Sequence, residues 1–138
     1  DIWHFGMSAM ICRSDSLDDL ASQIAEDLVA MPTESSLLEA TETLAESCIT
    51  TQSFSTSAFL GLMAASDLSF EQLYCMYVGK NVLNFFRQDH GYKDGSYIKI
   101  WAGREDNEHL SDLLIRLDPN QTDFADAVYR GLAEAYPG

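Results

Sequence analysis

Apolar residues recur at spacings of three and four positions along almost the whole chain, which is the period of an amphipathic α-helix. One brief stretch, "SYIKIW" at residues 96–101, reads instead as extended backbone. The sequence therefore predicts an all-α protein, a helical bundle, with helices over residues 1–12, 16–31, 34–49, 57–65, 70–90, 108–117 and 121–136.

Capping residues mark where these helices begin. Ser16 followed by Asp19 resembles a capping box, in which two side chains satisfy the free N–H groups of a first helical turn. Either Thr33 or Ser35 is expected to cap the helix that follows Pro32.

The second half of the chain carries similar signals. Ser69 is expected to cap the long helix over residues 70–90, and Gly91 is expected to end it. Asp106 or Asn107 is expected to cap the next helix. Between the two halves, the Ser/Thr-rich residues 50–57 are expected to form a loop.

Length and composition exclude several classes of protein. The 138 residues are enough for one domain with a hydrophobic core, and no apolar run reaches the length of a membrane span. With 22 acidic and eight basic residues, the chain lacks the positive face that a nucleic-acid binder needs. Three cysteines without metal or disulfide spacing indicate free thiols in a reducing compartment. We predict an intracellular, cytoplasmic location, with an organelle or the nucleus left open.

The few basic residues are gathered in one region. No lysine or arginine occurs over residues 14–79. Five of the eight then follow within 25 positions, and they are Lys80, Arg87, Lys93, Lys99 and Arg104. A local positive site in a protein of net charge −14 suits a small anion better than a polymer.

Helical geometry brings part of this positive charge together. Lys80, Asn84 and Arg87 are spaced four and three residues apart, so they lie in one stripe along the helix over residues 70–90. The helix leads directly into a segment that contains Tyr92 and Lys99. A solvated helix face is one interpretation of the stripe. The other is a cradle for a triphosphate, built from cations, a tyrosine hydroxyl and backbone amides.

A longer pattern favours the second interpretation. Residues 77–110, "YVGKNVLNFFRQDHGYKDGSYIKIWAGREDNEHL", resemble the C-terminal motifs of the dimeric all-α dUTPases, which belong with the MazG-like nucleoside triphosphate pyrophosphatases. The opening "DIWHF" is similar to the end of an E-x-x-D metal motif. Residues 13–68 match no motif of that family that we can quote, and their role stays open.

The resemblance implies hydrolysis of dUTP to dUMP and pyrophosphate by a Mg²⁺-activated water, in a protein that is a homodimer at full length. It implies phosphate contacts for Lys80, Arg87, Tyr92 and Lys99. It further implies that Asn84 and Asn107 orient the sugar or the phosphates, that His4 and Phe5 lie near the sugar and uracil, and that Asp1 binds Mg²⁺.

The same resemblance predicts that residues 1–138 form a single domain that lacks its N-terminal helices. The family's E-x-x-E helix and the glutamate of E-x-x-D would precede Asp1, so we expect this segment alone to be inactive. The glutamates after Asp1, at positions 34, 39, 42 and 46, are expected to form a solvated helix face rather than to replace those ligands.

Two other functions remain open at this point. One is a related pyrophosphatase that acts on dCTP as well as dUTP. The other is a helical module that binds nucleotides or protein partners without catalysis.

Overall fold

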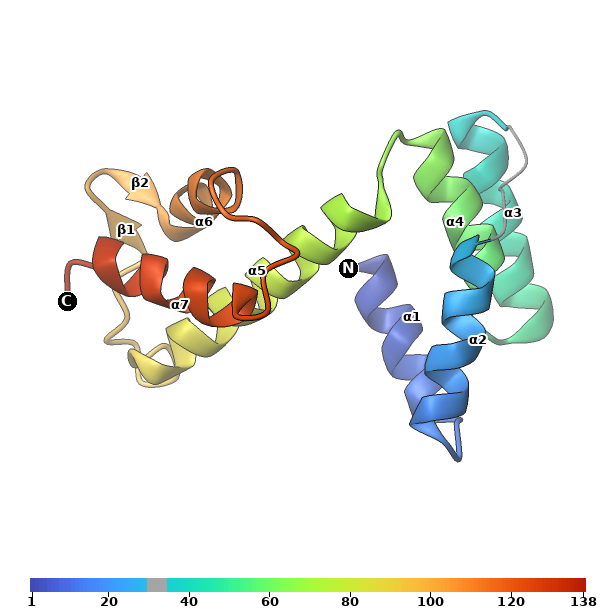
Figure 1. Cartoon of the computed structure of the whole chain (residues 1–138), viewed down its shortest axis with the longest axis horizontal. Helices are drawn as coiled ribbons and strands as arrows, with labels where there is room; N and C mark the ends of the chain where they lie inside the picture. The colour runs from blue at the N-terminus through green and yellow to red at the C-terminus, as the bar shows by residue number, and fades with distance from the viewer. Residues whose placement is uncertain (30–34) are drawn as a thin grey trace. The chain divides into compact units, whose positions relative to one another are not determined.

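A computed structural model describes residues 1–29 and 35–138 of the chain. The described residues form helices and one short hairpin, which confirms the all-α prediction (Figure 1). The elements are α1 (Ile2–Ile11), α2 (Leu17–Val29), α3 (Leu37–Thr51), α4 (Thr56–Ala65), α5 (Phe70–Asp89), β1 (Ile100–Trp101), β2 (Arg104–Glu105), α6 (Asp106–Leu114) and α7 (Phe124–Ala135).

The chain divides into two compact units, Asp1–Phe70 and Glu71–Gly138, and each is described by itself. That the chain forms a single domain stays a prediction. Within the described residues, no helix is both long enough and apolar enough to cross a membrane.

Two of the predicted helix starts lie in the first half of the chain, within the described residues. The Ser16 hydroxyl accepts a hydrogen bond from the Asp19 backbone N–H at 3.3 Å, as predicted. The cap of α3 is Ser36 rather than Ser35, because Glu39 lies three residues after Ser36 and its carboxylate accepts from the Ser36 N–H at 2.9 Å. The end at Met31, Pro32 and the alternative cap Thr33 fall outside the described residues.

The loop predicted for residues 50–57 is shorter in the structure. Helix α3 continues to Thr51 and ends at Gln52, whose φ of 52° is left-handed. The Ser55 hydroxyl then accepts from the Ala58 N–H at 3.2 Å and begins α4 at Thr56. The polar residues that suggested a longer loop are therefore partly capping residues.

Aromatic packing organises the N-terminal unit. Trp3 of α1 stacks on Phe59 of α4 with ring centroids 5.4 Å apart, and Phe54 meets the Trp3 ring edge-on at 6.3 Å. Gly6 allows this approach, because a Cβ atom there would lie 2.7 Å from the Phe54 ring. The buried apolar residues of this unit are Trp3, Ile24, Ala40, Leu44, Phe59 and Met63.

The C-terminal unit is built around Phe86 of α5, which has no solvent exposure. Its ring meets those of Trp101, Tyr129 and Tyr136 edge-on, at 5.2–5.9 Å between centroids. One core thus joins α5, the hairpin, α6 and α7, which make up the C-terminal unit (Figure 1). Its buried members are Val82, Leu83, Phe86, Trp101, Leu110, Phe124, Val128 and Leu132.

A tight hairpin directs the chain from this core into α6. Strands β1 and β2 pair antiparallel, with Trp101 opposite Arg104. The two residues between them, Ala102 and Gly103, have φ values of 49° and 84°. Two successive positive φ values are those of a type I′ turn, which suits the twist of paired strands. The extended segment predicted at residues 96–101 pairs only through its last two residues, and its partner strand was not predicted.

We expect this turn to respond in opposite ways to two substitutions. Gly103→Ala should lower the free energy of unfolding by about 1 kcal/mol, because an L-residue is strained at this φ although no atom crowds the position. Ala102→Asn should raise it, since Asn tolerates the left-handed region that Ala102 already occupies. Urea unfolding followed by circular dichroism measures both. Equal effects of the two substitutions would contradict a type I′ turn.

Candidate functional site

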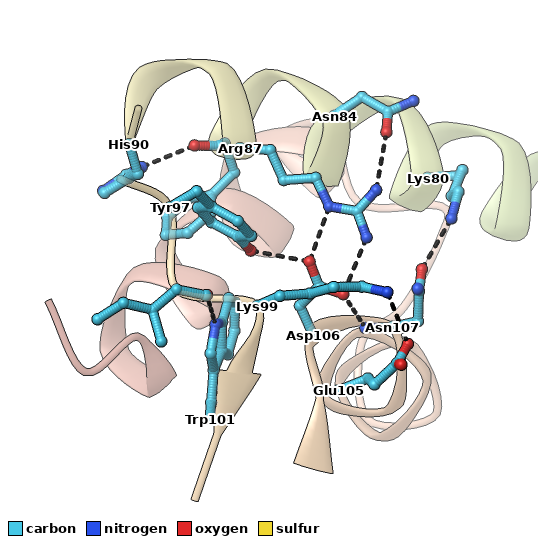
Figure 2. Close-up of polar contacts among 12 residues, drawn as sticks. Lys80, Asn84, Arg87, His90, Tyr97, Lys99, Trp101, Glu105, Asp106 and Asn107 are labelled. Carbon is cyan, nitrogen blue, oxygen red and sulfur yellow. Dashed lines mark hydrogen bonds and ion pairs between the residues drawn. The ribbon is translucent and has the colours of Figure 1, made fainter. Parts of the chain in front are cut away.

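Helix α5 presents three polar residues toward the start of α6. Figure 2 shows Lys80 and Arg87 extending from α5 toward Asn107 and Asp106, with Asn84 beside Arg87. The helix ends at Asp89, and Gly91 follows with a φ of 86°, as predicted for a helix stop. The stripe expected from the sequence is therefore present.

Arg87 and Asp106 form a bidentate ion pair. Arg87 Nε donates to Asp106 Oδ2 at 2.7 Å, and Nη2 donates to Oδ1 at 2.8 Å (Figure 2). The Arg87 side chain is 13% exposed and the Asp106 side chain is 0% exposed. Parallel charge-assisted hydrogen bonds of this kind are among the strongest polar contacts in proteins and fix the plane of the guanidinium.

Two further donors complete the environment of Asp106. The Tyr97 hydroxyl donates to Oδ2 at 2.9 Å, and the Asn107 backbone N–H donates to Oδ1 at 2.8 Å. Each carboxylate oxygen thus accepts two hydrogen bonds. Burial on its own raises the pKa of Asp106, but the hydrogen bonds from Arg87 and Tyr97 outweigh it and hold the pKa below its usual range.

The pKa values of the two side chains that donate to Asp106 shift in the opposite direction, upward. The hydrogen bond to Asp106 raises the pKa of Arg87 further above its already high value. Burial, and then the hydrogen bond to Asp106, raise the pKa of the Tyr97 phenol. At neutral pH the group therefore holds one carboxylate, one guanidinium and one neutral phenol.

Lys80 makes a parallel contact one residue further along α6. Its Nζ donates to Asn107 Oδ1 at 2.7 Å, so the consecutive residues Asp106 and Asn107 hold two cations of α5. Arg87 also approaches two other predicted site residues. Its Nη1 lies 3.4 Å from Asn84 Oδ1, and its guanidinium carbon lies 5.9 Å from the centre of the Tyr92 ring.

Lys99 reaches the same region from the segment before β1. Its Nζ lies 3.2 Å from Glu105 Oε2, and its carbonyl accepts from the Asp106 N–H at 3.0 Å. Both side chains of the Lys99–Glu105 ion pair are about half exposed, so the pair is weak and an anionic ligand can displace Glu105 from Lys99. The structure thus gathers six predicted residues in the C-terminal unit, and they are Lys80, Asn84, Arg87, Tyr92, Lys99 and Asn107.

The other three predicted residues belong to the N-terminal unit. Asp1 precedes α1 and is exposed, His4 is exposed, and the Phe5 side chain is 70% exposed. Within residues 1–29 and 35–138, no group of three His, Cys, Asp or Glu side chains could hold a metal ion. Asp1 therefore belongs to no such group among the described residues.

The sequence predicted Asp106 as a helix cap and, with Lys93 and Glu105, as a support of the site, without a partner for its carboxylate. The cap prediction was wrong, because Glu105 is the N-cap and Asp106 is the first residue of α6, fully buried. Tyr97 was missed. An acidic residue at the start of a helix can be an exposed cap or one half of a buried ion pair. Only the tertiary contact with Arg87 distinguishes the two for Asp106.

A model of the dUTPase family matches residues 1–92, about two thirds of the chain. The chain belongs to the all-α dUTPase family. This match includes Asp1, the stripe of α5 and Tyr92, and it supports a hydrolase of the dUTPase type. No curated protein matches the chain.

Removing the buried carboxylate of this dUTPase-family protein should weaken its fold. We expect Asp106→Asn to lower the free energy of unfolding by about 3 kcal/mol, because Arg87 is left largely buried without its counter-charge. Asp112→Asn is the matched control on α6. Asp112 pairs with Arg104 at 2.7 Å, but both side chains are 44% exposed, so little change is expected. Equal losses in the two variants, measured by urea unfolding, would contradict this assignment.

The ion pair also predicts a dependence on pH. Because the pKa of Asp106 is lower in the folded protein than in the unfolded chain, its contribution is fully present above about pH 4 and is lost as the pH falls through the folded-state value. The stability difference between wild type and Asp106→Asn should therefore shrink below about pH 4. Depressed pKa values at the exposed Asp112 and Asp123 are shared by both proteins and cancel. A difference that stays constant from pH 7 to pH 3 would contradict the prediction.

Proposed function

We propose that the protein is a dUTP pyrophosphatase, which hydrolyses dUTP to dUMP and pyrophosphate. Membership of the all-α dUTPase family supports this proposal. The observation that carries it is the meeting of Lys80, Arg87 and Lys99 around the start of α6, in a protein of net charge −14. The local positive charge attracts a small polyanion, whereas the net negative charge of the whole protein repels a large one.

Each of the three cations keeps donors for a ligand. The Lys80 ammonium has three N–H groups, and one of them donates to Asn107. Lys99 shares its charge with Glu105 in an exposed pair that a triphosphate can displace. Arg87 uses Nε and Nη2 for Asp106, and at its far end Nη1 makes a long hydrogen bond of 3.4 Å to Asn84 that a phosphate oxygen can replace.

These groups suit the charge that develops when a triphosphate is cleaved. Phosphoryl transfer is catalysed mainly by positioning and by fixed positive charge on the phosphate oxygens. In the proposed reaction the cations bind the phosphate chain and stabilise the leaving pyrophosphate, and Asn84 and Asn107 orient the substrate. His4 and Phe5 are proposed to contact the nucleoside. A requirement for Mg²⁺, with Asp1 as one ligand, belongs to the proposal.

We also propose that the protein acts as a homodimer. Large apolar side chains are exposed on α1 and α5, among them Ile2 at 53%, Phe5 at 70%, and Met76 and Phe85 at 60% each. Contact with a second subunit would remove such side chains from water. Light scattering on the full-length protein distinguishes a dimer from a monomer.

Removing one exposed cation tests the proposed phosphate contacts. In the full-length protein, we expect Lys80→Ala to lower kcat/KM for dUTP by roughly tenfold to a hundredfold, the effect of one lost charge-assisted hydrogen bond. Arg130→Ala is the matched control, because Arg130 pairs with Asp123 on the exposed face of α7 and should leave turnover unchanged. Pyrophosphate release measured with and without Mg²⁺ provides the readout.

The substrate panel decides whether the proposal holds. dUTP should be hydrolysed faster than dCTP, dTTP, dATP and dGTP. Turnover of dCTP at a similar rate would favour the broader pyrophosphatase. Absence of pyrophosphate release from every nucleotide, by protein that is folded by circular dichroism, would contradict the proposed reaction.

A further inference from the structure

The two edges of the Arg87 guanidinium have different environments. Asp106 occupies the side edge, through Nε at 2.7 Å and Nη2 at 2.8 Å. The end edge consists of Nη1 and the second N–H of Nη2, and Nη1 makes a long contact of 3.4 Å with Asn84 Oδ1. A guanidinium held along one edge presents parallel N–H donors at the other, which match two oxygens of a phosphate.

The carboxylate that holds Arg87 is itself held rigidly. Tyr97 donates to it at 2.9 Å, and the Tyr97 ring stacks on Tyr136 with centroids 5.6 Å apart and planes 9° apart. The backbone N–H of Asp106 donates to the Lys99 carbonyl at 3.0 Å. Neither the carboxylate nor its backbone can follow a displaced arginine without breaking these contacts.

We propose that Asp106, supported by Tyr97, is a positioning residue of the phosphate site. It lies buried and touches no ligand, and it fixes the Arg87 guanidinium so that the end edge faces the phosphate chain. This inference rests on the proposed function in taking a nucleotide triphosphate as the anion. It adds two residues, Asp106 and Tyr97, that act on that anion through Arg87.

A purely structural role explains the same contacts less well. A buried ion pair usually stabilises a fold no better than apolar side chains of similar size, because both charges lose their hydration. An arginine that must face a ligand in one orientation, in contrast, is well served by a carboxylate whose two oxygens are fixed in place, as those of Asp106 are for Arg87. The two roles differ in one measurable respect, because positioning acts only through Arg87.

A double-mutant cycle measures that dependence. In the full-length protein, the dissociation constant of α,β-imido-dUTP is measured by calorimetry for Tyr97→Phe and Asp106→Asn, each with Arg87 present and with Arg87→Ala. With Arg87 present, we expect Tyr97→Phe to weaken binding roughly threefold and Asp106→Asn about tenfold or more. In the Arg87→Ala background, both effects should fall below about twofold.

Controls and folding checks accompany the cycle. Tyr129→Phe removes a hydroxyl that donates to Asp89 at 2.9 Å, and Asp112→Asn removes an exposed carboxylate of α6. Both should leave the dissociation constant unchanged. If Asp106→Asn does not fold, Tyr97→Phe carries the test, because it leaves the ion pair in place. Losses of equal size in the two backgrounds, or no loss with Arg87 present, would overturn the proposal.

Inorganic tripolyphosphate separates this inference from the proposed function. If the protein hydrolyses no nucleotide but binds tripolyphosphate with the same coupling between Tyr97 and Arg87, the proposed reaction fails and the positioning role stands. If it hydrolyses dUTP and the cycle shows no coupling, the reaction stands and the positioning role fails. A protein that binds neither probe overturns the positioning role.

Discussion

Asp106 places a carboxylate where it has no contact with solvent, and an isolated charge in such a place would cost several kcal/mol. The structure compensates it completely, with two hydrogen bonds from Arg87, one from the Tyr97 hydroxyl and one from the Asn107 N–H. These donors come from α5, from the segment before β1 and from α6. Compensation of this one charge therefore requires all three elements to be in place.

The aromatic core and the hairpin make this arrangement possible. Phe86 and Trp101 pack edge-on and join α5 to β1, and the Trp101 indole N–H donates to the Ile98 carbonyl at 2.6 Å. The turn at Ala102 and Gly103 then reverses the chain so that α6 begins under the stripe of α5. Apolar packing thus decides where the helices lie, and the ion pair fixes one side chain within that frame.

The surface around the ion pair is also where the positive charge of the protein gathers. Lys80 and Lys99 have exposed side chains, each with one neutralising or polar partner, whereas Arg87 is mostly enclosed. Flexible exposed lysines supply charge, and an enclosed arginine supplies direction. A site with both kinds of cation is suited to a ligand that carries several negative charges and must be held in one orientation.

The helices and part of the candidate site could be predicted from local sequence. Periodicity located the helices, Gly91 marked the end of α5, and the spacing of Lys80, Asn84 and Arg87 placed them in one stripe, because each of these features depends on residues close together in the chain. Asp106 could not be recognised in the same way, since a carboxylate at the start of a helix is usually an exposed capping residue. Only the tertiary structure, which brings α6 against α5 although Arg87 and Asp106 are 19 positions apart in the chain, buries that carboxylate and pairs it with Arg87.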